Sequence, residues 1–226
     1  MRATAIVLGA GDGERLGAPV PKAFVELEGT TILELAVRAA AASSAIERIV
    51  VAVPAGSEDR ARSLLVDIPL PSVVVPGGAT RQGSVRAALQ AVPSDVAIVA
   101  VHDAARCFAP ADLFDRVVRA VAGGADGAVP VAPVPDTVKR VERGRVVGTI
   151  DRATIGLAQT PQAFRLEMLK RAHERAAAAG EVVTDDAMLL EDSAVIVAVE
   201  GDPGNAKITT DADLAWAISR LQATRG

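Results

Sequence analysis

Short runs of β-branched and aliphatic residues alternate with longer segments of helical periodicity along most of this chain, and this alternation limits the fold strongly. The short runs are almost uninterruptedly apolar, which is typical of strands covered on both faces of a sheet. Repeated strand and helix units predict an α/β fold with a doubly wound, mostly parallel sheet and right-handed connections. The expected strands are Ala3–Leu8, Arg48–Val53, Val73–Val75, Val96–His102 and Ala128–Val131, and the expected helices are Thr31–Ser44, Ser57–Leu65, Gln82–Ala91 and Pro110–Ala122.

The pattern then changes to a short ribbon. Two β-type runs, Val138–Val141 and Arg145–Ile150, flank Glu142-Arg143-Gly144 and predict an inserted β-hairpin. Such a ribbon fits either a surface excursion or an arm that pairs two subunits. No linker or repeat interrupts the chain, so we expect one domain over residues 1–226 with an arm at about 136–152. The later elements expected are helices over Arg165–Ala179, Thr184–Asp192 and Asp211–Gln222 and a strand over Ala194–Glu200.

Composition excludes several classes of protein. A chain of 226 residues, 50% of them apolar, can bury a core without stabilising crosslinks. Cys107 is the only cysteine, which excludes intrachain disulfides and zinc sites built from two or more cysteines. The first apolar run, Ala3–Leu8, is too short for a signal peptide or a membrane span, so we expect a soluble, cytoplasmic protein without membrane contact. The net charge of −4 gives no global field for nucleic acid.

The first strand is followed by a glycine-rich turn, Leu8–Gly17. In open parallel sheets, ligands bind beyond the carboxyl ends of the strands, where turns and helix N-termini present backbone amides. Gly9, Gly11 and Gly13 would let the backbone approach an anion closely and aim several N–H groups at it. We therefore expect an anion-binding turn here.

Two familiar phosphate-binding motifs do not match this turn. A dinucleotide fingerprint would need glycine at Glu14 and an acidic residue at the end of the second strand, where Val53-Pro54 stands. A P-loop needs glycine followed by lysine, a pair that this chain lacks. What is left is a glycine turn with Arg15 and, after a proline, Lys22, which are either anion-binding groups or simply solvated charges.

The fourth strand ends in a second polar segment, His102-Asp103-Ala104-Ala105-Arg106. An aspartate here is placed to hold Mg²⁺ through one oxygen while phosphates and waters complete the shell. Taken alone, it is more simply an ordinary loop carboxylate that caps the next helix. His102 is interpreted as a strand-end residue with its hydrogen bonds satisfied, because the other histidine, His173, lies on a distant segment. Cys107 is interpreted as a small buried residue rather than a nucleophile.

Further polar segments follow other strands and helices. The loop Pro76–Ser84 suits either close contact with a base and ribose or a capped turn that begins a helix. Taken alone, Thr184 is most simply a helix cap and Lys207 a surface lysine. Thr160, which precedes Pro161, is likewise most simply a residue at the end of a strand or helix.

Taken in order, these segments form one pattern. They are Gly9–Arg15, Pro21-Lys22, Gly77-Gly78 with Arg81 and Ser84, Val101–Arg106, Asp136–Arg140, Asp151-Arg152, Gln159–Gln162, Thr184-Asp185 and Asn205–Lys207. The set resembles the 2-C-methyl-D-erythritol 4-phosphate cytidylyltransferases of the non-mevalonate isoprenoid pathway. The glycine turn with its arginine and lysine is shared by many nucleotidyltransferases, whereas the His-Asp-Ala-Ala-Arg string and Asp136-Thr137 narrow the resemblance to this branch.

The resemblance implies a Rossmann-like nucleotidyltransferase fold and a homodimer that, with Mg²⁺, converts CTP and a methylerythritol phosphate to a CDP-alcohol and pyrophosphate. Carried over by motif, Arg15 and Lys22 would stabilise the transition state and Asp103 would hold the metal. The nucleotide would lie against Gly9, Ala10, Gly11, Gly13, Gly78, Ala79, Ser84 and Ala104. The sugar phosphate would be held by Arg106, Thr137, Arg152, Thr160 and Lys207.

The chemistry of such a transfer agrees with these residue types. Attack of a phosphate oxygen on the α-phosphorus of a triphosphate gathers negative charge on the equatorial oxygens and on the departing pyrophosphate. Positioning and cations therefore supply most of the catalysis, and no protein nucleophile is needed.

The chain also departs from the family's usual pattern at three places. Leu8-Gly9 stands where Pro-Ala is common, Ala79 where an acidic residue is frequent, and Cys107 where proline is usual. The alternatives are a cytidylyltransferase for another polyol phosphate, such as ribitol 5-phosphate, and a non-catalytic nucleotide-binding module, which would need fewer cations. A metal-dependent glycosyltransferase usually has a second carboxylate two positions on, where this chain has Ala105.

Overall fold

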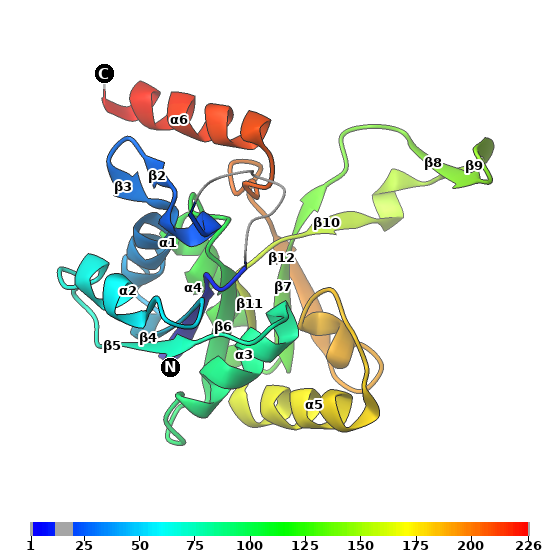
Figure 1. Cartoon of the computed structure of the whole chain (residues 1–226). Helices are drawn as coiled ribbons and strands as arrows, with labels where there is room; N and C mark the ends of the chain where they lie inside the picture. The colour runs from blue at the N-terminus through cyan, green and yellow to red at the C-terminus, as the bar shows by residue number, and fades with distance from the viewer. Residues whose placement is uncertain (1, 12–19, 226) are drawn as a thin grey trace.

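A computed structural model describes residues 2–11 and 20–225, and it shows an eight-stranded sheet between two layers of helices (Figure 1). The strand order is β10-β7-β11-β6-β1-β4-β5, with β12 paired to β7. Neighbouring strands are parallel except where β10 and β11 pair with β6 and β7. The strands are β1 (Ala3–Leu8), β4 (Ile46–Val53), β5 (Ser72–Pro76), β6 (Ile98–Asp103), β7 (Gly127–Pro133), β10 (Gly156–Ala158), β11 (Gln162–Arg165) and β12 (Ile196–Glu200).

Alternate side chains of each central strand enter opposite layers of the core. Ala5 and Val7 of β1 pack in one layer, whereas Ile6 and Leu8 pack in the other. The first layer is covered by α1 (Ile32–Ala41), α2 (Glu58–Leu64), α4 (Ala111–Ala122) and α6 (Asp211–Arg225), and the second by α3 (Arg81–Gln90) and α5 (Leu166–Ala179). Helices on both faces explain why the strands are apolar throughout.

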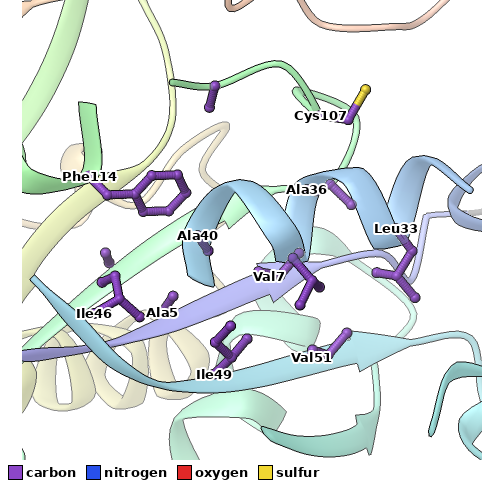
Figure 2. Close-up of a cluster of buried hydrophobic side chains, with 14 of the residues drawn as sticks. Ala5, Val7, Leu33, Ala36, Ala40, Ile46, Ile49, Val51, Cys107 and Phe114 are labelled. Atoms are coloured by element: carbon purple, nitrogen blue, oxygen red, sulfur yellow. The ribbon is translucent and has the colours of Figure 1, made fainter. Parts of the chain in front are cut away.

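The first layer of the core is shown in Figure 2. Val7 of β1 and Ile49 and Val51 of β4 lie beneath α1, while Phe114 reaches in from α4. Cys107 lies at the edge of this layer and is buried. Tight packing of such small and branched side chains brings the strand ends close together, which fixes the geometry of the turns that follow them.

A capping box sets the start of α1. Thr31 Oγ1 accepts a hydrogen bond from the Glu34 amide at 3.2 Å, and Glu34 Oε2 accepts one from the Thr31 amide at 3.0 Å. These bonds satisfy amides that a helix N-terminus leaves unpaired. They hold α1 where Ile32 and Leu33 pack fully buried in the core.

The predicted hairpin forms as expected. Strands β8 (Val138–Glu142) and β9 (Arg145–Ile150) pair antiparallel, and residues 143 and 144 make the turn with positive φ angles. Figure 1 shows this ribbon extending away from the central sheet, connected through β10. Val141, Val146 and Val147 are exposed, because no other described element covers this part of the ribbon.

The doubly wound sheet is confirmed, and each expected strand appears with ends within a few residues. The helix expected over Thr184–Asp192 is wrong, since only a short 3-10 turn forms, η4 (Ala187–Leu189). The carboxylate of Asp185 accepts bonds from Gln162 and the Met188 amide, while Asp186 turns inward. Short acidic side chains that bind elsewhere compete with regular helical structure.

Some elements carry no signal strong enough to predict. The strands β10 and β11 are short and pair antiparallel within a mostly parallel sheet. A small hairpin, β2 (Glu26–Leu27) with β3 (Thr30–Thr31), precedes α1, and its turn residues Glu28 and Gly29 have positive φ. A 3-10 turn, η2 (Lys22–Phe24), precedes this hairpin. Within the described ranges, no helix combines the length and apolar character needed to cross a membrane.

Candidate active site

A cavity of about 900 Å³ opens beyond the carboxyl ends of β1, β4, β5 and β6. This is the edge of an open parallel sheet at which ligands characteristically bind. The sequence-predicted residues that line it are Gly9, Ala10, Gly11, Lys22, Gly78, Ala79, Ser84, Asp103, Ala104 and Lys207. Residues that are more than a hundred positions apart in the sequence therefore share one site.

The glycine turn contributes only in part as expected. The Gly9 amide donates to the Ala52 carbonyl at 2.7 Å, so the expectation that it points at an anion is wrong. Gly9 instead allows close packing, because a Cβ there would lie 3.2 Å from the Ala23 Cβ. Gly11 is exposed at the cavity. Arg15 and Gly13, predicted to act on the triphosphate, lie outside the described residues.

Lys22 begins the 3-10 turn η2 and reaches the cavity. Its Nζ donates to the Ile208 carbonyl at 3.0 Å. Ile208 follows Lys207, and its amide donates to the Ala105 carbonyl at 2.8 Å. The segment that carries Lys207 therefore also fixes the position of the Lys22 ammonium, which places two cations on the same side of the cavity.

The loop after β5 is both a capped turn and a cavity wall. Thr80 Oγ1 accepts from the Gly83 amide at 3.0 Å and caps α3. Ser84 Oγ accepts from the Gly78 amide at 3.1 Å and donates to the Thr80 carbonyl at 2.9 Å. A Cβ at Gly78 would lie 2.7 Å from the Gly83 carbonyl carbon, so only glycine fits there without displacement. Ala79 adds no polar side chain, so a polar contact from position 79 can come only from its backbone.

Asp103, the last residue of β6, has a cation on each carboxylate oxygen. Arg81 Nε lies 3.0 Å from Oδ1, and Lys207 Nζ lies 2.6 Å from Oδ2. Burial alone would raise the pKa of this carboxyl, but the charges of Arg81 and Lys207 hold the pKa well below its ordinary value. Asp103 is therefore ionised. Its interpretation as a helix cap is wrong, because Pro110 is the residue before α4 and no side chain caps that helix. Lys207 is likewise not a plain surface lysine.

His102 is held as expected for a satisfied strand-end residue. Its Nε2 lies 3.2 Å from the Arg106 carbonyl, and its Nδ1 lies 3.1 Å from Thr160 Oγ1. The carbonyl can only accept, so Nε2 carries the proton and Nδ1 accepts from the threonine. Burial lowers the pKa of His102 to about 4, against an opposing effect of Asp103, so the ring is neutral.

Thr160 supports the site from beneath. It is buried, and its Oγ1 accepts from the Asp103 amide at 3.0 Å while it bonds His102. This geometry makes Thr160 a support for the end of β6 rather than an exposed contact for the sugar phosphate. Cys107 is equally inaccessible, since burial raises the pKa of its thiol to about 12 and it stays a protonated, buried group.

Arg106 ties two segments beside the cavity. Its Nη1 donates to the Asn205 carbonyl at 2.8 Å, and its Nη2 donates to the Ala158 carbonyl at 3.2 Å. Burial lowers the pKa of this guanidinium below its ordinary value, with an opposing contribution from Asp103. Arg106 thus joins the end of β10 to the loop that carries Lys207.

The two arm residues predicted to bind the sugar phosphate are not among the residues that line the cavity. Thr137 is exposed at the base of the hairpin, and Arg152 is exposed in a short 3-10 turn, η3 (Arg152–Thr154). Arg152 donates from Nη1 to the Pro135 carbonyl, which fixes the two ends of the hairpin to each other. Thr184, exposed, donates to the Met188 sulfur and caps no helix.

Three residues at or behind the cavity wall had no predicted role: Arg81, Asp186 and His173. Besides its contact with Asp103, Arg81 contacts Asp186, and Asp186 contacts His173. Arg81 is visible in the motif string, but nothing in the sequence pattern connects it to residues 173 and 186. Their proximity depends on how α3, α5 and η4 pack, which is tertiary information.

Comparison with known proteins identifies the family. The family model for 2-C-methyl-D-erythritol 4-phosphate cytidylyltransferase matches residues 3–223. A protein of that name from Saccharopolyspora erythraea is 45% identical over 226 residues, which cover 98% of this chain and 100% of the relative.

Solved structures agree. The crystal structure of 2-C-methyl-D-erythritol 4-phosphate cytidylyltransferase from Thermus thermophilus is 34% identical, with a TM-score of 0.81 over 98% of this chain and 100% of that one. The 4-diphosphocytidyl-2C-methyl-D-erythritol synthase of Anaerococcus prevotii is 28% identical, with a TM-score of 0.88 over 98% of this chain and 96% of the other. A fold, a cavity and a full-length match of this kind lead to one conclusion: the chain belongs to the 2-C-methyl-D-erythritol 4-phosphate cytidylyltransferase family.

Proposed function

We propose that this chain transfers the cytidylyl group of CTP to 2-C-methyl-D-erythritol 4-phosphate in the cavity beyond β1, β4, β5 and β6, releasing pyrophosphate. The observation that carries the proposal is the convergence of Lys22, Lys207 and Asp103 on a cavity walled by small residues. Small residues at the end of β1 and in the loop after β5 leave room for a nucleotide, and the lysines supply positive charge for its phosphates.

The reaction needs little covalent chemistry from the protein. An oxygen of the acceptor phosphate attacks the α-phosphorus of CTP, a new O–P bond forms, and the bond from the α-phosphorus to the bridging oxygen of pyrophosphate breaks. Negative charge grows on the equatorial and leaving oxygens as this happens. We assign the stabilisation of that charge to Lys22 and Arg15, with Gly78, Ala79 and Ser84 lining the place of the cytosine and ribose.

The chemistry of the donors fits a Mg²⁺ ion shared with the substrate. Asp103 is an ionised carboxylate facing the cavity, and the Lys207 ammonium already shows that its Oδ2 accepts a cation. Mg²⁺ commonly uses one or two carboxylates together with substrate phosphates and waters. Within residues 2–11 and 20–225, no group of three or more acidic, histidine or cysteine side chains is placed to hold a metal ion, so we assign the ion to Asp103 together with substrate phosphates and waters. When bound, the ion would neutralise charge on the triphosphate.

We further propose a homodimer formed through the arm at about 136–152 of a single domain. An isolated two-stranded ribbon is marginally stable in water, and this one exposes Val141, Val146 and Val147. In such a dimer, each copy would cover the exposed valines of the other. Thr137 and Arg152 of one copy would then reach the cavity of the other copy, where the acceptor phosphate needs cations. A cytoplasmic location is a further prediction for this protein.

Pyrophosphate release tests the proposal. We would measure it with Mg²⁺ for the four common nucleoside triphosphates, each paired with methylerythritol phosphate, ribitol 5-phosphate and other polyol phosphates. We expect release with CTP and the methylerythritol phosphate above all other pairs. A preference for ribitol 5-phosphate would instead favour the related cytidylyltransferase, and no release with any pair would overturn the proposal.

A further inference from the structure

A chain of charged and titratable side chains leads from the cavity into the protein interior. Lys207 contacts Asp103, Asp103 contacts Arg81, Arg81 contacts Asp186, and Asp186 contacts His173. The last two N···O distances are 2.8 Å for Arg81 Nη1 to Asp186 Oδ2 and 2.9 Å for His173 Nε2 to Asp186 Oδ1. The five residues come from five separate segments of the chain.

The two ends of this chain differ in exposure. The Lys207 side chain is 40% exposed, whereas Asp186 and His173 are each 1% exposed. His173 lies on α5, which packs against both α3 and η4, and Asp186 lies immediately before η4 and contacts Arg81 at the start of α3. The inner end is therefore fixed by burial, and the outer end lies on a loop at the cavity.

Burying the Asp186 carboxylate costs solvation free energy, so its position in the interior calls for an explanation. Buried ion pairs often contribute little net stability, because removal from water offsets their attraction. A carboxylate on the far side of Arg81 does, however, control how the guanidinium meets Asp103. An arginine without such a partner tends to pair with a carboxylate through two parallel N–H···O bonds and would cover both oxygens.

We propose that Asp186, oriented by His173, is a positioning residue that holds Arg81 on Oδ1 of Asp103 and so keeps Oδ2 available to a cation. The geometry agrees, because only Nε of Arg81 reaches Asp103, at Oδ1, while Nη1 is turned to Asp186. Oδ2 is left to the Lys207 ammonium, which contacts it at 2.6 Å and which a metal ion would replace there. This inference rests on the proposed role of Asp103 as the metal ligand and adds the residues that prepare it.

The test measures how much Mg²⁺ strengthens CTP binding, without acceptor and therefore without turnover. Calorimetric titrations with Mg²⁺ and with EDTA give this metal-linked gain as a ratio of affinities. Asp103→Asn is the reference and should abolish the gain. Asp186→Asn should reduce it about tenfold, because Arg81 then covers both oxygens and outer partners of metal ligands commonly affect metal affinity on this scale.

Three further variants separate positioning from general damage. His173→Leu removes the donor to Asp186 and should reduce the gain about threefold, less than Asp186→Asn, because only one hydrogen bond is lost and the carboxylate remains. His173→Gln keeps an N–H donor near the place of Nε2 and should restore most of the gain. Asp115→Asn is the matched control, since Asp115 accepts bonds from Ser43 and the Ala45 amide far from the cavity. It should leave the gain unchanged even if stability falls.

The outcomes distinguish the two claims. If Asp103→Asn abolishes the gain while folded Asp186→Asn and His173→Leu keep it, the positioning inference is overturned and the role of Asp103 stands. If the wild-type protein shows no metal-linked gain, or Asp103→Asn keeps it, both claims fall. Should Asp186→Asn not fold, the His173 pair decides, because both of those variants retain the carboxylate.

Discussion

Lys22 is the described residue with the most direct proposed part in the chemistry. Its ammonium is held by the Ile208 carbonyl at 3.0 Å, at the edge of the cavity. A donor fixed in advance stabilises charge that develops only in the transition state, so its loss affects turnover more than binding.

We therefore expect Lys22→Ala to lower kcat by roughly 10²- to 10³-fold, the effect of removing one preorganised donor, while CTP affinity falls far less. Steady-state kinetics together with calorimetric CTP binding would measure both. An unchanged kcat would show that Lys22 is a bystander, and an equal loss in both would make it a ground-state binding group.

Single residues show clearly where sequence reasoning succeeds. The positions of His102 and Asp103 follow from a strand that ends at a known edge of a parallel sheet, and the structure confirms both positions. The burial of Cys107, predicted for a small apolar residue, is also confirmed. The direction of the Gly9 amide was not predictable, because its partner, Ala52, belongs to another strand. The contact between Asp186 and Arg81 was not predictable either, because the two residues lie on different elements of the fold.

At the scale of elements, the loop after β5 depends on a close approach of two backbone segments. A Cβ at Gly78 would meet the Gly83 carbonyl carbon at 2.7 Å, and Ser84 bonds the Gly78 amide. Any side chain there must push the loop away from the start of α3.

We expect Gly78→Ala to lower the free energy of unfolding by about 1–3 kcal/mol, as overpacking commonly does, and to weaken CTP binding. Gly148→Ala is the matched control, because a Cβ at Gly148 has no heavy atom within 4 Å. Denaturant unfolding and CTP titration of both variants would check this. Equal stabilities for the two would contradict the tight approach.

Helices and strands were predictable where a single pattern of apolar residues dominated the segment. Strongly periodic helices such as α4 and apolar strands such as β1 appear nearly at their expected bounds. Strand β11 has only four residues and an antiparallel partner on each side, so no alternation announces it. A helix was predicted over segment 184–192, yet Asp185 and Asp186 also contact Gln162 and Arg81, which lie outside the segment.

At the scale of the whole molecule, the arm is the feature that a single chain does not explain. Thr137 and Arg152 are exposed and apart from the residues that line the chain's own cavity, although their motif predicts contact with the sugar phosphate. A two-fold dimer in which each arm completes the partner's site would account for both facts.

Subunit exchange tests this arrangement. Mixing Lys22→Ala with Arg152→Ala chains gives heterodimers in which one site carries both changes and the other carries neither, if the arm acts in trans. With random pairing, half of the dimers regain one of two sites, so activity should recover to about a quarter of wild type. No recovery after confirmed exchange would assign Arg152 to its own chain's site.

The central claim is that the cavity transfers a cytidylyl group, and the most direct measurement follows the phosphorus atoms of CTP. The protein is incubated with Mg²⁺, methylerythritol phosphate and CTP labelled at either the α- or the γ-phosphorus, with Lys22→Ala in parallel. The account predicts the α label in the CDP-alcohol and the γ label in pyrophosphate, both greatly slowed in the variant. The γ label on the acceptor, or the α label only in free CMP or CDP, would contradict it.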